Sequence, residues 1–258
     1  MEAGNLRRPL GEFCVLGHRG AMGHAPENTL VSFAKAIELK ADMTELDVHL
    51  SKDGELVVMH DPSVERTTGA VGLISDLTLA EIKSLDAGSR FAPEFAGERV
   101  PILQEVMELV KGKIALNVEV KAGREGLYPG IIDSLITEIE RHKIVDSVVV
   151  SSFYRPYLVE LRRKAPHIKA ALLYSKAFDE PWQDAVDQGW DLHPHLSLVD
   201  ARLVDEAHAR GVLIRAWNPN EAEKMRPLVA LGVDGIGTNY PEVLQKVWRE
   251  YHPERSKP

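Results

Sequence analysis

The sequence predicts an α/β protein that folds as a closed (β/α)8 TIM barrel. From Phe13 onward, short runs rich in β-branched residues alternate with longer segments of 3.6-residue hydrophobic periodicity, which is the pattern of repeated βα units and a parallel sheet. Eight strands and eight helices in strict alternation favour a closed barrel over an open doubly wound sheet. The length of 258 residues matches the roughly 250 of a typical barrel. We therefore expect one domain over residues 1–258.

The predicted strands are short apolar runs between turn signals. They are Phe13–Gly17, Met43–Leu50, Ile114–Lys121, Ser147–Ser152, Lys169–Tyr174, Trp190–His193, Val212–Trp217 and Val233–Gly237. Several of the predicted helices open on a capping residue or an early proline. They begin near Asn28, Ile102, Pro129, Tyr154, Asp179, Val199, Asn220 and Pro241.

One further strand, Leu56–His60, does not belong to this alternation. It follows the second strand across Asp53-Gly54, which is a strong two-residue turn signal, so we expect it to be the return arm of a β-hairpin. A turn centred on these two residues pairs Asp47 with His60. Residues 61–101 then form a small insertion, rich in Gly, Thr and Ser, with one helical stretch at Leu79–Ser84. We expect the insertion to lie over the face of the barrel that carries the functional loops.

Composition and charge favour small-molecule chemistry. Hydrophobic residues make up 44% and charged residues 27% of the chain, which allows a sizeable core without disulfides, and Cys14 is the only cysteine. The net charge of −8, without a Lys/Arg cluster, argues against binding to nucleic acid or an anionic membrane. No signal peptide and no apolar run of about 20 residues is recognised. We expect a soluble, cytoplasmic protein without stable membrane anchoring, and a homodimer remains open.

Polar clusters fall where predicted strands end, which is where side chains point into the mouth of a barrel. The first is His18-Arg19-Gly20, followed by Pro26-Glu27-Asn28-Thr29 at the start of the first helix. The same run is also typical of a turn with a helix-capping residue. A different run, His193-Pro194-His195, has no acidic partner by strand alternation, and we expect it to have a loop or structural role.

Two predicted strands each carry several polar side chains on one face. In the second strand, alternation places Glu45 and Asp47 together and turns Leu46 to the other face. Two carboxylates facing a barrel interior repel each other unless a cation or base neutralises them; a solvated edge strand is the alternative. In Asn117-Val118-Glu119-Val120-Lys121 the three polar residues share a face, where an internal Glu–Lys ion pair is the alternative.

Together these residues form an inventory suited to phosphodiester cleavage. Oxygen ligands from Glu45, Asp47 and Glu119 suit Mg²⁺ or Ca²⁺ better than a soft metal. Arg19 and Lys121 are candidates for holding an anionic phosphate. His18 and His60 titrate near neutral pH, as proton transfer from a nucleophile and to a leaving alcohol requires.

The ordered motifs of the chain resemble those of the glycerophosphodiester phosphodiesterases from about Phe13 to about Trp248. The likeness rests on His18-Arg19-Gly20, Pro26-Glu27-Asn28-Thr29, Glu45-Leu46-Asp47-Val48, Lys52-Asp53-Gly54, Val57-Val58-Met59-His60-Asp61, Arg66-Thr67-Thr68-Gly69, Asp76-Leu77-Thr78, Phe95-Ala96-Gly97-Glu98, Pro101, Glu119-Val120-Lys121, Ser152-Phe153, Trp217 and Asp234-Gly235-Ile236-Gly237-Thr238-Asn239-Tyr240-Pro241. A lone His-Arg-Gly would be a weak signal, but the ordered set is highly specific.

The resemblance implies roles for these positions. It implies a divalent cation, Mg²⁺ or Ca²⁺, held by Glu45, Asp47 and Glu119. It also implies His18 and His60 as the acid/base pair, Arg19 and Lys121 as phosphate contacts, and Phe153 with Trp217 as an apolar wall beside the glycerol. Where the family commonly has a Trp-Thr-Val-Asn run, this chain has Trp217-Asn218-Pro219-Asn220, so no role is carried over to Asn220.

The implied activity is metal-dependent hydrolysis of a small-molecule glycerophosphodiester, such as glycerophosphocholine or glycerophosphoethanolamine, to glycerol 3-phosphate and an alcohol. Which histidine acts as the base, and whether a glycerol hydroxyl or water attacks first, stay open. Two alternatives also remain: a lysophospholipase D that acts on lysophospholipids, and a non-catalytic barrel that binds a metal for structure.

Overall fold

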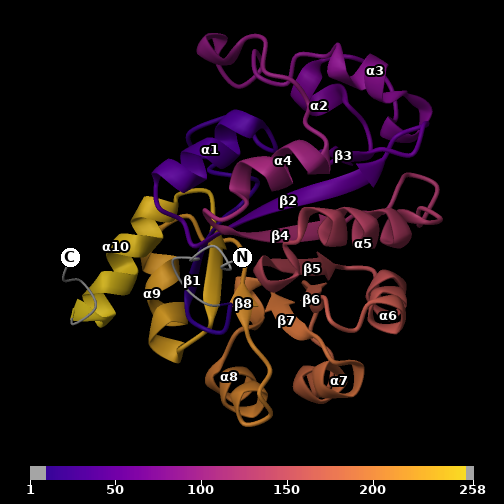
Figure 1. Ribbon diagram of the computed structural model, residues 1–258. Helices are drawn as coiled ribbons and strands as arrows, with labels where there is room; N and C mark the ends of the chain where they lie inside the picture. The colour runs from indigo at the N-terminus through magenta and orange to yellow at the C-terminus, as the bar shows by residue number, and fades with distance from the viewer. Residues whose placement is uncertain (1–9, 254–258) are drawn as a thin grey trace.

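The computed structural model describes residues 10–253 as a nearly closed barrel of eight parallel strands with helices between them (Figure 1). In order of hydrogen-bonded neighbours the strands are β7 (Asp191–Pro194), β6 (Lys169–Tyr174), β5 (Val148–Ser152), β4 (Ala115–Val120), β2 (Met43–Leu50), β1 (Cys14–Gly17), β9 (Gly235–Thr238) and β8 (Arg215–Ala216). Bridges of Leu192 with Ile214 and of His195 with Trp217 join the β7 and β8 segments. The predicted barrel is confirmed.

The helices of the βα units surround this sheet in Figure 1. They are α1 (Leu30–Glu38), α4 (Leu103–Val110), α5 (Ile131–His142), α6 (Arg155–Lys164), α7 (Pro181–Gln188), α8 (Ala201–His208), α9 (Ala222–Leu231) and α10 (Pro241–Tyr251). Local signals explain where several of them start. The Thr29 and Asp200 side chains accept hydrogen bonds from backbone amides in the first turns of α1 and α8, and a proline lies at the start of α6, α7 and α10. Such caps satisfy amides that have no partner within the helix.

The predicted hairpin is present, but its predicted register is wrong by one residue. Strand β3 (Leu56–Val58) pairs antiparallel with β2, and Val48 lies opposite Val58. The loop runs from Ser51 to Glu55, whose backbone groups are joined by a 3.0 Å hydrogen bond, so its centre is Asp53 alone. The Asp53 carboxylate accepts from Ser51 Oγ and from the Leu79 amide, which stabilises this odd-numbered loop. Asp47 therefore faces Met59, with a 3.0 Å bond from the Met59 amide to the Asp47 carbonyl.

The segment between β3 and α4 forms short helices with a small core of its own. They are α2 (Glu65–Thr68), η1 (Ile74–Asp76), α3 (Leu79–Lys83) and η2 (Pro93–Phe95), and Figure 1 shows α2 and α3 grouped beside the β2–β3 hairpin, apart from the other helices. The helical stretch predicted at Leu79–Ser84 is thus confirmed. The core of this segment consists of Val57, Met59, Val64, Ile74, Ile82, Ala87 and Val100. It packs the segment against the hairpin rather than leaving it as an open loop.

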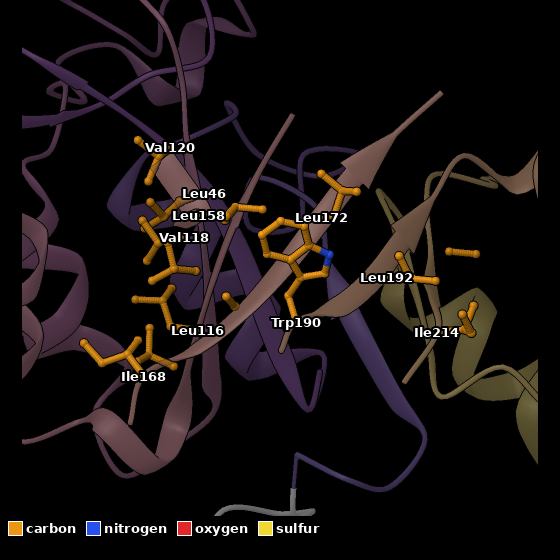
Figure 2. Packing of buried hydrophobic residues seen from close by; sticks show 14 of the residues in the cluster. Leu46, Leu116, Val118, Val120, Leu158, Ile168, Leu172, Trp190, Leu192 and Ile214 are labelled. Atoms are coloured by element: carbon orange, nitrogen blue, oxygen red, sulfur yellow. The ribbon is translucent and has the colours of Figure 1, made fainter. Parts of the chain in front are cut away.

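Strand alternation separates an outer apolar layer from a polar interior, as predicted. Leu46, Leu116, Val118 and Val120 are buried in the main hydrophobic cluster with helix residues such as Leu158, and Figure 2 shows these side chains grouped together. The residues between them on β2 and β4 face the barrel interior. At the N-terminal ends of the strands the interior is filled by Leu10, Cys14, Leu16, Met43, Ala115, Val149 and Ala171. The polar side chains therefore collect at the C-terminal ends.

Within residues 10–253, no helix combines the length and the hydropathy that a membrane span requires.

Candidate active site

A cavity of about 250 Å³ opens among the C-terminal ends of the strands. Of the predicted site residues, all except Asp47 line it: His18, Arg19, Glu45, His60, Glu119, Lys121, Phe153 and Trp217. Asp47 lies next to Glu119 in the sheet register and is 1% exposed. The structure therefore brings together residues from β1, β2, β4, β5, β8 and the end of the hairpin.

Three buried carboxylates meet at this cavity: Glu45 and Glu119 line it, and Asp47 lies beside Glu119. One oxygen each from Glu45, Asp47 and Glu119 lies within 4.8 Å of the other two. Neither Glu45 Oε1 nor Asp47 Oδ1 has a hydrogen-bond donor among the described residues, although Lys121 Nζ lies 3.3 Å from the latter atom. Oxygen atoms that are buried, close together and partly unpaired form the donor set of a hard divalent cation such as Mg²⁺ or Ca²⁺. The residues present fit such an ion.

The electrostatics of the cluster support the same interpretation. Burial, followed by repulsion from Asp47 and Glu119, raises the pKa of Glu45 well above its usual value. Burial also raises the pKa of Glu119 to about 7, against the opposing effect of Lys121. Burial acts in the same direction on Asp47, but Lys121 and Arg19 outweigh it and hold the pKa of Asp47 low. The cluster thus has more carboxylates than its own cations neutralise, which a bound divalent cation would correct.

We expect Glu45→Gln to stabilise the protein in the presence of a chelator, and more so at high pH. A carboxyl group whose pKa is raised on folding contributes stability below about pH 4.5 that is lost as the pH rises through the folded pKa. Glutamine has no such loss. The melting temperature of the variant should exceed that of the wild type at pH 8 by at least about 2 °C, the shift that 1 kcal/mol produces at this size, and by less at pH 5.

The control is Glu223→Gln, because the Glu223 side chain is 81% exposed and lies in the first turn of α9, outside the cavity lining. Saturating Mg²⁺ or Ca²⁺ should reverse the order, since only the wild type keeps every carboxylate ligand. Equal melting temperatures at pH 8 in chelator would show that Glu45 is not under charge repulsion.

Two cations border the carboxylates. The Arg19 backbone amide donates to Glu45 Oε2 at 2.9 Å, its Nη1 donates to Glu27 Oε1 at 2.9 Å, and its Nε lies 3.4 Å from Asp47 Oδ2. Lys121 Nζ is 2.7 Å from Glu119 Oε1. Burial alone would lower the pKa of Lys121, but Glu119 and Asp47 together raise it. Both side chains therefore remain charged beside the cavity.

His18 is held in one tautomer. Its Nδ1 lies 2.8 Å from Asn239 Oδ1, an oxygen that can only accept, so Nδ1 carries the proton. Its Nε2 lies 3.2 Å from Asn218 Nδ2 and 4.0 Å from Glu45 Oε2. Burial, with the neighbouring Arg19, lowers the pKa of His18 to about 4. The ring is thus neutral near pH 7, with its free electron pair on the nitrogen that faces the carboxylates.

His60 reaches the cavity although the predicted register is wrong, because it lies beyond the end of β3. Its Nδ1 is 2.7 Å from Asp61 Oδ1, and its carbonyl is 3.1 Å from His49 Nε2. Burial, Lys121 and Arg19 lower the pKa of His60, while Asp47 and Asp61 oppose them. Because Asp61 occupies Nδ1, Nε2 is the ring nitrogen of His60 that is left for the cavity.

Arg66, from α2, binds the two carboxylates that hold Arg19 and His60 in place. Its Nη1 and Nη2 each donate to Glu27 at 2.7 Å, and its Nε donates to Asp61 Oδ2 at 2.6 Å. Glu27 in turn bonds Arg19, and Asp61 bonds His60. The motif containing Arg66 was visible in the sequence, but which carboxylates it bridges depends on contacts across the fold.

The far wall of the cavity contains Phe153 and Trp217, whose rings meet edge to face with centroids 5.6 Å apart. His193, which the sequence predicts to have a loop or structural role, lies in β7 rather than in a loop and lines the cavity, as does Arg215. Arg215 alternates with Trp217 along the predicted strand Val212–Trp217, and that spacing is the signal by which its inward direction was predictable. Asn218 also lines the cavity.

Asn220, to which no role was carried over, supports the site indirectly. Its Oδ1 accepts from the Asn239 amide at 2.9 Å and from Thr238 Oγ1 at 3.3 Å. Asn239 is the residue that orients His18. Asn220 therefore stabilises the segment behind that histidine.

Comparison with known proteins agrees with this arrangement. The model of the glycerophosphoryl diester phosphodiesterase family matches residues 18–243. A glycerophosphodiester phosphodiesterase of Caldanaerobacter subterraneus subsp. tengcongensis is 43% identical over 92% of this chain and 98% of its own. One from Bacillus subtilis is 34% identical over 96% of this chain and 90% of its own.

The similarity extends to the fold of a solved structure. The phosphodiesterase of Oleispira antarctica, in complex with the product sn-glycerol-3-phosphate, superposes with a TM-score of 0.85 at 33% identity, covering 90% of this chain and 95% of that one. The family match spans the cavity residues from His18 to Gly237. The chain belongs to the glycerophosphoryl diester phosphodiesterase family.

Proposed function

We propose that the enzyme hydrolyses glycerophosphodiesters of small alcohols, such as glycerophosphocholine and glycerophosphoethanolamine, to glycerol 3-phosphate and the free alcohol, and that it requires Mg²⁺ or Ca²⁺. The observation that carries this proposal is the meeting of three buried carboxylates at the cavity that two imidazoles and two cationic side chains line. The similar glycerophosphodiester phosphodiesterases support the reaction class.

His18 and His60 divide the proton transfers in this proposal. His18 presents an unprotonated Nε2 toward the carboxylates and acts as the general base. His60, whose Nδ1 is bonded to Asp61, is the general acid, because a carboxylate at that nitrogen stabilises the imidazolium that donates from Nε2. His60 protonates the leaving alcohol oxygen as the bond to phosphorus breaks.

The remaining residues bind and orient the substrate. A divalent cation held by Glu45, Asp47 and Glu119 would neutralise charge that develops on the phosphoryl oxygens. Arg19 and Lys121, already beside those carboxylates, attract the phosphate from two sides. Phe153 and Trp217 present apolar ring surface to the carbon atoms of glycerol.

The test is release of glycerol 3-phosphate from glycerophosphocholine and from lysophosphatidylcholine in parallel, after chelation and then with Mg²⁺ or Ca²⁺ restored. The proposal expects turnover of the first substrate only with a cation present. Cleavage of the lysolipid alone would instead assign a lysophospholipase D activity. Inactivity on both substrates with either cation would leave a non-catalytic metal-binding barrel.

We expect Arg66→Ala and Arg66→Lys each to lower kcat by roughly 10- to 100-fold, the usual range for residues that orient a metal site or its neighbours. Arg66 binds two carboxylates through three nitrogens, a fork that lysine cannot reproduce. Because its side chain is 47% exposed, the loss of stability should stay within about 1 kcal/mol.

Arg226→Ala is the matched control, because Arg226 also forks onto one carboxylate, that of Glu250, and is 40% exposed. Its kcat should equal that of the wild type. If Arg66→Lys kept full kcat, the bridge between Glu27 and Asp61 would have no part in positioning the site.

A further inference from the structure

Three further polar side chains line the cavity, deeper than Asp47 and Glu119. Asn117 precedes Glu119 by two residues on β4 and is the sheet partner of Glu45, Arg215 begins β8 two residues before Trp217, and His193 lies in β7. Asn117 and His193 are 3% exposed and Arg215 is 2% exposed. Because N-terminal positions on barrel strands lie deeper, these residues form the floor of the cavity.

Each floor residue carries a buried polar atom without a partner in the part of the chain that the structure describes. Asn117 Oδ1, His193 Nε2 and Arg215 Nε have no hydrogen-bond partner within residues 10–253. Buried polar atoms in proteins are paired in about 90% of cases or more, because an unpaired one keeps its full desolvation penalty. Three such atoms at the end of one cavity indicate a place built for a polar group of a ligand.

The floor is closed from below. The apolar layer at the N-terminal ends of the strands includes Leu16, Met43 and Val149, all at most 6% exposed. Arg215 reaches down to this layer through a hydrogen bond to the Leu10 carbonyl and lies 3.3 Å from Asp191 Oδ2. A group that enters the floor therefore meets a dead end, with no passage for a long acyl chain.

The chemistry of the floor suits a hydroxyl group. Asn117 Oδ1 accepts and Arg215 Nε donates, while a neutral His193 either accepts or donates. Burial, with Arg215, keeps the pKa of His193 well below its usual value. A hydroxyl both donates and accepts. A choline or ethanolamine cation would be repelled by Arg215, and its ammonium group offers no acceptor for the N–H of Arg215. The cationic leaving alcohol is thus excluded from the floor.

We propose that Asn117, His193 and Arg215 bind the free terminal hydroxyl of the substrate's glycerol and thereby select diesters whose glycerol is unacylated. This inference rests on the proposed function, with the phosphate among Arg19, Lys121 and the carboxylates. The cavity of about 250 Å³ has room for the glycerol unit, since a water-sized group takes about 30 Å³. An acyl ester at the terminal oxygen removes its proton and adds a chain that the closed floor cannot admit.

The test compares glycerophosphocholine with 2-hydroxypropyl phosphocholine, which lacks only the terminal hydroxyl. A site that hydrogen-bonds a hydroxyl rejects the analogue without it, so wild-type kcat/KM should be at least roughly 10²-fold lower on the analogue. His193→Leu should lose at least about tenfold on glycerophosphocholine, stay within about threefold on the analogue, and so lose most of the preference. His193→Gln, which restores a polar atom near Nε2, should recover part of it.

Bis(p-nitrophenyl) phosphate, which has no glycerol, reports whether the proton-transfer and metal-binding residues remain intact in each variant. His167→Leu is the control for loss of a histidine, because His167 is 51% exposed and precedes β6 at the opposite end of the barrel. A wild type that cleaves glycerophosphocholine and the analogue equally well, or a His193→Leu enzyme that keeps the preference, would overturn the floor site alone. A wild type that cleaves only the nitrophenyl diester would overturn the proposed function, and the floor site with it.

Discussion

Asp47→Asn is expected to lower kcat/KM on glycerophosphocholine by about 10³-fold, which corresponds to about 4 kcal/mol of transition-state stabilisation. Asp47 is 1% exposed and contacts Lys121 at 3.3 Å, Arg19 at 3.4 Å and Asn28 at 2.8 Å. An amide of the same shape keeps the packing but removes the charge that attracts a divalent cation and balances both cationic side chains. The loss should therefore appear in cation binding as well as in turnover.

The binding measurement is the rise in melting temperature on addition of Mg²⁺ or Ca²⁺ to chelated protein. A ligand that binds only the folded state stabilises it by mass action, so the wild type should show a clear rise and Asp47→Asn a much smaller one at the same cation concentration. Asp133→Asn serves as the control, because Asp133 is 62% exposed and pairs with Lys164 on the outer surface. An unchanged cation-induced shift in Asp47→Asn would remove Asp47 from the metal site.

The second large effect is a difference between the two histidines that depends on the leaving group. On glycerophosphocholine, His18→Ala and His60→Ala should each lose roughly 10²–10⁴-fold in kcat, the range for one general acid or base. On a glycerophosphodiester of p-nitrophenol, whose anion leaves without protonation, His60→Ala should recover to within about tenfold of the wild type. His18→Ala should keep its full loss in kcat, because the attacking hydroxyl or water still needs a base.

The result shows which histidine is the general acid and which is the general base. Recovery by His18→Ala alone would exchange the acid and the base, and recovery by neither variant would mean that leaving-group protonation does not depend on a single histidine. His195→Ala is not a suitable control, because its ring packs against Trp217 with centroids 4.9 Å apart. His167→Ala is suitable, since His167 is 51% exposed and its ring bonds Glu140 at the surface.

Local sequence patterns were sufficient for the barrel and for the faces of its strands. Alternation placed Glu45, Asp47 and Glu119 on the interior face because successive side chains of a strand point to opposite sides, and their apolar neighbours are indeed packed against helices. The chain order of strands and helices predicted the parallel sheet. Both signals depend only on residues near one another in the chain.

The hairpin shows where such patterns fail. The Asp53-Gly54 signal favours a two-residue turn, but Asp53 accepts hydrogen bonds from Ser51 and from the start of α3, a helix in the insertion. That tertiary contact stabilises a five-residue loop, Ser51 to Glu55, and moves the register by one. His60 nevertheless enters the cavity, because the chain leaves the sheet before that residue.

By itself the sequence determined the fold class, the inward-facing carboxylates and the family motifs, because these depend on strand periodicity and on residue types at set spacings. Only the tertiary structure decided which groups pair: Arg66 with Glu27 and Asp61, and Asn239 with His18. It also decided that His193 and Arg215 meet at the floor of the cavity. Apart from Asp61 and Arg66, which are five residues apart in the insertion, these partners come from different βα units, and their distances depend on how the closed barrel packs, which no local pattern specifies.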